Sequence, residues 1–238
     1  MSGRLIVNVD DLGATRGVQR ALEACLRSGT VTSATLMANG PYFEEAVRFA
    51  HANPRLGVGV HLNLVQWSPI LPPEGLPGLV DGEGRFLSRS ALLRQALRGR
   101  LKAGQVKAEL RAQVERCLSA GIRVTHVDSH QHCGLLPGVF PSMLEIAREF
   151  ELPVRIPREP LLVEDNTWRH FGAAYLRKVI LGPRAARCKR KAETARVRTP
   201  DVFLSFSAVF PRRCDLPTVK RLLAQAPGRV AELGVHPA

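Results

Sequence analysis

Short apolar runs in this chain repeatedly end on carboxylate or imidazole side chains. The residues that close these runs are Asp10 and Asp11, His61, Asp128 and His130, and His236. Apolar runs of this length, separated by segments long enough for a helix, are typical of parallel β-strands. Parallel strands point their C-terminal ends the same way, so the sequence predicts that these side chains converge at one end of a sheet.

Segments with helical spacing of apolar residues separate the runs. Helices are expected near residues 15–27, 41–52, 90–98, 105–120, 141–150, 167–180 and 216–225, and further strands at 31–38, 154–156 and 202–206. Repeated β-α units favour a parallel sheet covered by helices. Polar groups close nearly every strand, whereas an open doubly wound sheet concentrates its site at one switch point. We therefore expect an α/β fold of the distorted TIM-like barrel type.

The length of the chain suits one domain, because barrels of this class run to about 250 residues. Residues 66–88 are rich in proline and glycine, a composition typical of a long loop. We expect a single domain over residues 1–238, with the long loop at about 66–88 and a basic helical insertion at about 165–198.

The basic segment 177–198 carries nine lysine and arginine residues against one acid, Glu193, in a chain of net charge +13. Such a segment attracts an anionic partner, either nucleic acid or a membrane surface; the alternative is a solvated face without a partner. Aromatic residues make up only 5% of the chain. The stacking platforms of single-strand binders are therefore missing, and no nucleic-acid partner is expected. Membrane-surface contact through this segment and a homo-oligomer are kept as hypotheses.

Several classes of protein are excluded. No apolar stretch approaches the roughly 20 residues that cross a bilayer. The first predicted strand begins by Leu5, which leaves no room for the apolar region of a secretory signal. The five cysteines form no C-x-x-C pair, which suits reduced thiols and predicts a cytoplasmic protein. The glycine loops of dinucleotide and P-loop proteins are absent.

Asp10 and Asp11 are adjacent carboxylates at the end of the first strand. Side chains alternate along a strand, so one carboxylate can face a metal ion while the other faces an attacking water. The alternative is a pair that caps a following helix. His61 alone would more often be a hydrogen-bonded core residue, but the other candidate ligands favour a metal-binding role.

The stretch from His126 to His132 is the most specific in the chain. Strand alternation places His126, Asp128, His130 and His132 on one face, which is costly in a core unless a metal ion or hydrogen bonds satisfy them. We expect His126 and Asp128 to brace the others. Carboxylates and imidazoles that converge at strand ends are typical of divalent-metal hydrolases.

Three residues are candidates for contact with a substrate: Arg155, His132 and Asn39. Arg155 can hold a carboxylate or a sugar hydroxyl, and a surface salt bridge is the alternative. Asn39 closes the second predicted strand, and His132 ends the histidine-rich stretch.

Four segments resemble the motifs of the YdjC-like carbohydrate deacetylases. They are Asp10–Gly13, Gly59–Leu64, Thr125–His132 and Val235–Ala238, and the segments Val31–Ala34 and Val154–Pro157 resemble lesser landmarks of that family. The resemblance implies a distorted TIM-like barrel that removes N-acetyl groups from amino sugars with a divalent ion. The chain is also similar to the branch associated with hopanoid biosynthesis, which acts on an N-acetylglucosamine-bearing lipid. It departs from the family pattern at Gln131 and Cys133, one of which is often histidine.

The resemblance also implies roles. Asp11, His61 and His130 hold one divalent ion, either Mg²⁺ or Zn²⁺. Asp10 is the general base for the attacking water, and His236 is the general acid for the leaving amine. Two other hypotheses remain: a carbohydrate-binding protein that has lost catalysis, and another metal hydrolase such as a phosphoesterase.

Overall fold

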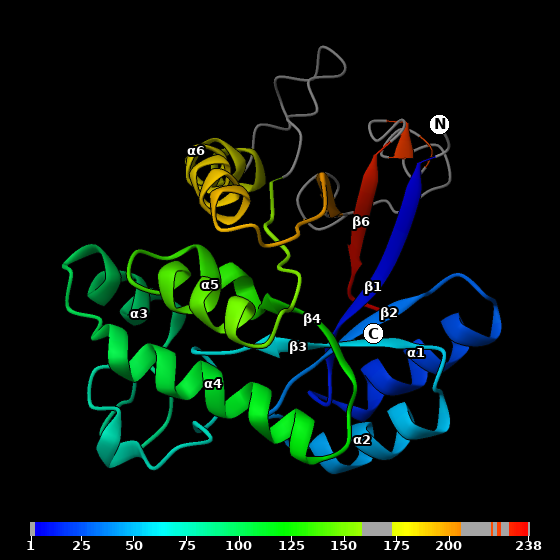
Figure 1. The fold of residues 1–238 in the computed structure, drawn as a ribbon. Helices are drawn as coiled ribbons and strands as arrows, with labels where there is room; N and C mark the ends of the chain where they lie inside the picture. Colours follow the sequence, from blue (N-terminus) through cyan, green and yellow to red (C-terminus); the bar gives the residue numbers. More distant parts are fainter. Residues whose placement is uncertain (1–2, 159–172, 206–219, 221–222, 225–228, 238) are drawn as a thin grey trace.

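A six-stranded parallel sheet forms the centre of the computed structural model, which describes residues 3–158, 173–205, 220, 223–224 and 229–237. Its strands are β1 (Arg4–Leu12), β2 (Ser33–Leu36), β3 (Gly57–Leu62), β4 (Val124–Ser129), β5 (Val202–Ser205) and β6 (Val230–Val235). They lie in the order β4-β3-β2-β1-β6-β5, and every neighbouring pair is parallel. The sheet curls strongly between β6 and β3 (Figure 1). It is an incomplete TIM-like barrel, which confirms the predicted fold class.

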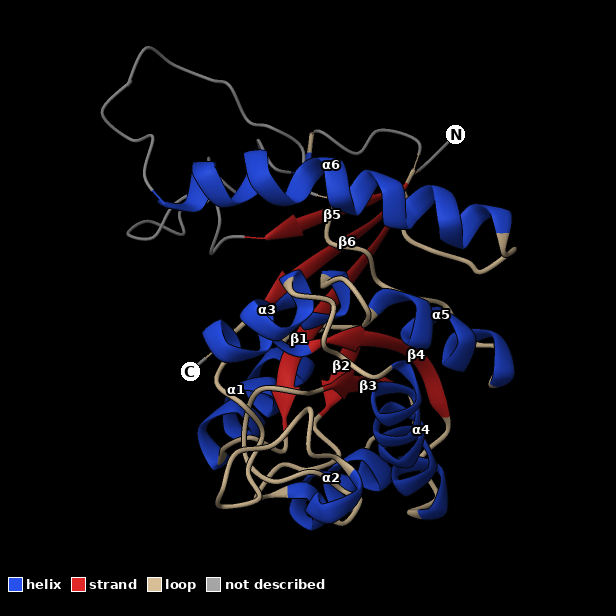
Figure 2. Cartoon of the chain, turned by 90° about the vertical axis from the view of Figure 1, so that its left-hand side faces the viewer, coloured by secondary structure: helices blue, strands red, loops and turns tan. Residues whose placement is uncertain are grey.

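Helices cover the strands (Figure 2). They are α1 (Arg16–Arg27), α2 (Phe43–Ala52), α3 (Arg89–Leu97), α4 (Ala103–Ser119), α5 (Phe140–Glu149) and α6 (Ala173–Thr194), with 3-10 turns η1 (Pro73–Gly75) and η2 (His130–Leu135). The first five helices start and end within about two residues of the predicted bounds. The helix predicted at 216–225 falls mostly outside the described residues.

The two faces of the sheet have different chemistry. On β3, Val58, Val60 and Leu62 belong to the hydrophobic core, and α4 contacts this strand. The alternate β3 positions, Gly59 and His61, face β4 side chains on the concave side. Buried polar residues gather on that concave side, which gives the curled sheet an interior of hydrogen bonds and ion pairs.

The segment 154–156 is not a regular strand, and the prediction was wrong there. Val154 makes a single parallel bridge to Val127, with Arg155 N–H donating to the Val127 carbonyl over 3.0 Å. Pro153 and Pro157 flank the segment, and a proline has no N–H to extend a ladder. The bridge nonetheless holds Arg155 next to the end of β4.

The long loop at 66–88 is attached to α4 by two polar side chains of that helix. The Glu109 carboxylate accepts hydrogen bonds from the backbone N–H groups of Ile70 and Leu71, both over 3.0 Å. The Gln105 amide oxygen accepts from Gly78 N–H over 3.2 Å. Since Glu109 is fully buried, these bonds replace water as its partners.

Helix α6 has one buried and one basic side in its described part. Ala185, Cys188 and Ala192 are buried, whereas Arg187, Arg190 and Lys191 are among its exposed residues. Arg184 donates to the Leu135 carbonyl and so attaches α6 to η2. Residues 165–172 of the predicted insertion lie outside the described part. Within the described residues no helix has the length and apolar character required to cross a bilayer.

Gly59 and Gly57 test how tightly β3 and β4 pack on the concave side. A Cβ at Gly59 would lie 2.5 to 2.7 Å from three atoms of the His126 ring, whereas a Cβ at Gly57 would meet nothing closer than 3.5 Å. We expect Gly59→Ala to lower the free energy of unfolding by about 1–3 kcal/mol, because overpacking forces neighbours apart. Gly57→Ala on the same strand is the matched control. Urea denaturation measures both, and equal stability of the two variants would contradict the packing argument.

Candidate functional site

A β-bulge places both aspartates of β1 at the same site. Between Val9 and Leu12 the strand advances three residues while β2 advances two, and Asp11 has a left-handed φ of 64°. Bulges re-aim side chains at strand ends. As a result Asp10 Oδ2 and Asp11 Oδ2 lie 3.6 and 4.0 Å from the same atom, His236 Nε2. The extra residue replaces the simple alternation expected from the sequence.

Asp11, His61 and His130 converge from three strand ends. Asp11 Oδ1 lies 3.2 Å from His61 Nε2 and 2.9 Å from His130 Nδ1. One ligand atom from each residue lies within 4.8 Å of the others, so the three can hold one metal ion. Burial would raise the pKa of Asp11, but hydrogen bonds from His130 and His61 hold it well below its usual range. Asp11 is therefore an ionised carboxylate.

His61 is oriented from behind by Asp128. His61 Nδ1 lies 2.6 Å from Asp128 Oδ1 and 3.2 Å from Thr35 Oγ1. Donation of the Nδ1 proton to Asp128 leaves Nε2 to face Asp11, which is how a carboxylate orients a metal-binding histidine. Burial lowers the pKa of His61, but Asp128, Asp11 and Asp10 outweigh this effect and raise it to about 10. The surrounding carboxylates thus favour positive charge at this position.

The donor set fits a divalent ion. One carboxylate and two imidazoles suit zinc and, with water, magnesium. His130 is buried, and its Nε2 has no hydrogen-bond partner among the described residues. Asp10, His61 and Asp128 form a second set with metal-ligand spacing. Arg155 already supplies a cation to both carboxylates of that second set, so the set with Asp11 is the better candidate.

Arg155 is buried beneath Asp10. Its guanidinium donates to Asp10 Oδ1 and Oδ2, both over 2.8 Å, and Nη1 forms an ion pair with Asp128 Oδ2 over 2.6 Å. Burial would raise the pKa of Asp10, but Arg155, with His61 and His236, holds it well below its usual range. All these contacts are with protein carboxylates, and direct contact of Arg155 with a substrate stays a prediction.

Glu232 was not recognised in the sequence. It is buried on β6, and its Oε1 accepts from Arg155 Nε over 2.6 Å. Burial raises the pKa of Glu232 to about 7, although Arg155 opposes the shift. A glutamate inside the apolar run 230–235 could have indicated this contact in the sequence, because an acidic side chain in a buried strand needs a partner.

The other predicted residues lie around this centre. Asn39 donates to the Gln66 and Ser68 carbonyls, and His132, with a φ of 57°, packs edge-on against Phe203 with ring centroids 5.9 Å apart. His126 contacts β3 and is kept neutral, because burial lowers its pKa to about 4. His236 is exposed above Asp10. Their roles toward a substrate stay predictions.

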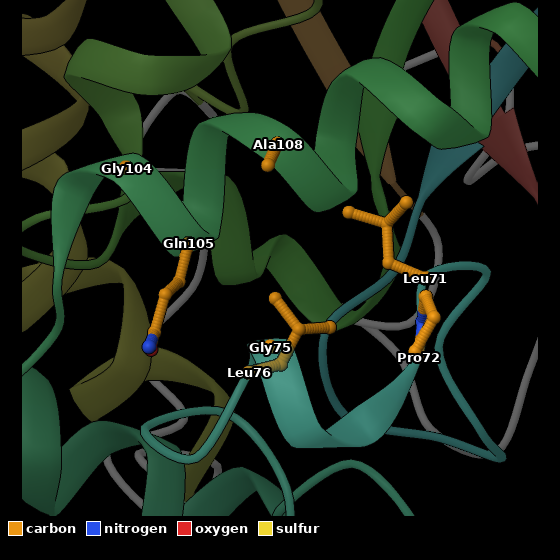
Figure 3. Close-up of a pocket in the computed structure, with 7 residues that line it drawn as sticks. All are labelled: Leu71, Pro72, Gly75, Leu76, Gly104, Gln105 and Ala108. Atoms are coloured by element: carbon orange, nitrogen blue, oxygen red, sulfur yellow. The ribbon is translucent and has the colours of Figure 1, made fainter.

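A cavity of about 410 Å³ lies between the long loop and α4 (Figure 3). It is lined by Leu71, Pro72, Gly75, Leu76, Gly104, Gln105 and Ala108. None of the carboxylates or histidines described above lines it. The cavity is therefore distinct from the candidate metal centre.

Solved structures resemble this fold. A suggested cellobiose-phosphate cleavage protein from Enterococcus faecalis superimposes with a TM-score of 0.75 at 28% identity, over 100% of this chain and 82% of that protein. A lactam utilization protein from Thermus thermophilus gives a TM-score of 0.50 at 16% identity, over 98% of this chain and 90% of that protein. The second likeness concerns the fold alone.

Sequence comparison gives the family. A carbohydrate deacetylase of Brevibacillus brevis is 44% identical over 154 residues, which are 65% of this chain and only 59% of that relative. A carbohydrate deacetylase of Listeria monocytogenes serotype 4a is 30% identical over 99% of this chain and 81% of its own length. The sequence pattern of the YdjC-like proteins matches residues 4–238. The chain therefore belongs to the YdjC-like family.

Proposed function

We propose that this protein is a metal-dependent carbohydrate deacetylase that hydrolyses the N-acetyl group of an amino sugar. The observation that carries the proposal is the convergence of Asp11, His61 and His130 within 4.8 Å of one another, with Asp10 and His236 beside them. The names of the relatives from Brevibacillus brevis and Listeria monocytogenes support the reaction class.

Asp11, His61 and His130 would hold the ion, either Mg²⁺ or Zn²⁺. A divalent ion lowers the pKa of water and polarises a carbonyl, the two effects that hydrolysis of an amide requires. Asp128 fixes the ring of His61 through its 2.6 Å contact with Nδ1. The left-handed backbone of Asp11 turns its carboxylate toward both imidazoles.

Asp10 is the proposed general base. Its contact with Arg155 keeps it ionised and orients the carboxylate, while His236 lies on its exposed side. The same ion pair lowers the proton affinity of Asp10. A weak base accepts a proton efficiently only from an acidic partner, so this arrangement suits a water whose own pKa has been lowered.

His236 is the proposed general acid. Its side chain is exposed, and its Nε2 lies 3.6 Å from Asp10 Oδ2. His236 is therefore a solvent-accessible residue next to the proposed base. A leaving amine must gain a proton as the amide bond breaks, and imidazole is the side chain best suited to donate it near neutral pH.

Metal content tests the ligand set without any guess about the substrate. We expect about one divalent ion per chain in the wild type after reloading, measured by elemental analysis, and loss of that ion in His130→Ala. His51→Ala is the matched control, because His51 is exposed on α2 and bonds to the Ala120 carbonyl. Absence of metal in the wild type, or its retention in His130→Ala, would contradict the site.

Asp10→Asn and Asp11→Asn separate the base from the ligand. Asp10→Asn should retain the ion and lose about 10²–10⁴-fold in the rate of acetate release, because a general base typically contributes that factor. Asp11→Asn should lose the ion itself. Acetate release from N-acetylated sugars is measured beside phosphate release from sugar phosphates. Full activity of Asp10→Asn would contradict the assignment of Asp10 as the general base. Release of phosphate without release of acetate would favour a phosphoesterase.

A glycolipid is the substrate class that the basic side of α6 favours. Arg187, Arg190 and Lys191 are exposed on this helix, and basic residues near an anionic membrane each contribute about 1 kcal/mol of attraction. A protein that acts on a lipid-linked sugar has to meet the surface in which that lipid is embedded. The basic side of α6 would provide this contact.

Charge reversal tests this contact. The combined variant Arg187→Glu, Arg190→Glu and Lys191→Glu should weaken co-sedimentation with vesicles of phosphatidylserine and phosphatidylcholine roughly 100-fold at low salt. The same reversal at Arg89, Arg94 and Arg98, which are exposed in the region of α3, changes the net charge equally and should leave binding nearly unchanged. Equal loss in both triple variants, or binding only to duplex DNA, would contradict a membrane contact through α6.

A further inference from the structure

Trp67 has a backbone conformation that a bulky residue seldom adopts. Its φ is 62°, in the left-handed region that favours glycine. A tryptophan there is held against its own preference, because the Cβ crowds the following carbonyl. Such a conformation persists only where the surrounding contacts determine it, and strained residues of this kind concentrate at ligand sites.

Hydrogen bonds fix three consecutive carbonyls around Trp67. The Gln66 carbonyl accepts from Asn63 Nδ2 over 2.7 Å and from Asn39 Nδ2 over 3.0 Å. The Trp67 carbonyl accepts from Phe86 N–H over 2.9 Å, and the Ser68 carbonyl accepts from Asn39 Nδ2 over 2.9 Å. Four hydrogen bonds on three carbonyls over-determine the backbone, which explains how the left-handed residue is tolerated.

The anchors place Trp67 at the end of the sheet that carries the metal centre. Asn39 follows β2, and Asn63 follows β3 directly after His61 and Leu62. Asn63 Nδ2 also donates to Asn39 Oδ1 over 3.1 Å, so the two anchors form one unit. Because the C-terminal ends of β1, β2 and β3 lie side by side, the residues that anchor the backbone at Trp67 belong to the same end of the sheet as Asp11 and His61.

The indole of Trp67 does not pack in the hydrophobic core. It is half-buried and does not belong to the hydrophobic cluster of the described residues or to the side chains packed against it. Its neighbour Ser68 is exposed. An aromatic ring on a backbone fixed by hydrogen bonds at this end of the sheet, and that the core does not use, is available to a ligand.

We propose that Trp67 is the platform on which the sugar ring of the substrate stacks. An N-acetylated amino sugar carries no charge, so ion pairs cannot supply its affinity. One face of a pyranose ring consists of C–H groups, which fit the apolar face of an indole, while the indole N–H can meet a hydroxyl. The inference rests on the proposed function, because it names how the same site recognises its sugar.

This inference gives Asn39 a different role from direct contact with the sugar. Both N–H bonds of its amide are used on the Gln66 and Ser68 carbonyls, and its oxygen is used by Asn63. Asn39 is therefore a positioning residue that acts through Trp67. The carboxylate of Glu109 supports the same loop at Ile70 and Leu71.

Trp67→Gly provides a test that does not depend on a fragile variant. Glycine accepts a φ of 62° without strain, so the variant should melt at or above the wild-type temperature. With the methyl glycoside of N-acetylglucosamine, KM should rise roughly tenfold, which corresponds to about 1.4 kcal/mol, at nearly unchanged kcat. Trp67→Phe should be intermediate. Leu97→Ala, which truncates an exposed apolar side chain of α3, should match the wild type.

A substrate without a ring distinguishes stacking from general damage. N-acetylethanolamine carries the same acetamide, and its KM should be equal in the wild type and Trp67→Gly. An unchanged KM for the glycoside in Trp67→Gly, or an equal rise for both compounds, would overturn the platform.

A measurement of sugar binding tests the stacking platform independently of the deacetylation reaction. Binding of the glycoside, measured by NMR titration, should weaken roughly tenfold in Trp67→Gly even if the wild type releases no acetate. That result would retain the platform and reject deacetylation. No binding of the glycoside by the wild type would overturn the platform.

Discussion

The buried guanidinium of Arg155 is the group on which the rest of the structure depends. It contacts Asp10 on β1, Asp128 on β4 and Glu232 on β6. Strands β4 and β6 are separated by β3, β2 and β1 in the sheet, so one side chain ties together strands that share no backbone hydrogen bonds. It therefore holds the curl of the sheet, and loss of one partner from a buried ion pair typically costs about 3–5 kcal/mol. Phe203 packs against the same guanidinium, with its ring centroid 5.0 Å away.

This ion cluster also separates the roles of two adjacent aspartates. Asp10 is buried and contacts Arg155 from below, whereas Asp11, after the bulge, is more exposed and contacts the imidazoles of His61 and His130. Identical side chains thus acquire different chemistry from their surroundings. The glycine at position 59 serves the same arrangement, because its missing Cβ lets His126 pack closely below His61 and Asp128. The polar interior is closely packed at this position.

The sequence predicted the six strands of the sheet, the first five helices and the convergence of Asp10, Asp11, His61, Asp128, His130 and His236, because these depend on local periodicity and on the common direction of parallel strands. Apart from the bracing expected of His126 and Asp128, it did not predict what the interior side chains contact. Arg155 and Asp10 are 145 residues apart, and no local pattern links them. Glu232 was passed over because it stands in an apolar run. The hydrogen bonds of Asn39 to the long loop were not predicted because they depend on tertiary structure. The β-bulge at Asp11 was not predicted, because the alternation of side chains along a strand assumes a regular strand.

Left-handed residues mark the places where strands end at the site. Of the six described residues other than glycine with positive φ, four are Asp11, Trp67, Gln131 and His132, and they follow or end β1, β3 and β4. A left-handed residue turns the chain at the end of a strand, and at Asp11 this turn accompanies a carboxylate that faces His61 and His130. This conformation costs backbone free energy, and at Trp67 the hydrogen bonds that Asn39 and Asn63 donate to the neighbouring carbonyls offset it. Replacement of such a residue by glycine removes the strain together with the functional side chain. Stability and function are therefore expected to change in opposite directions at these positions. This opposition distinguishes a residue of a functional site from a residue of the hydrophobic core.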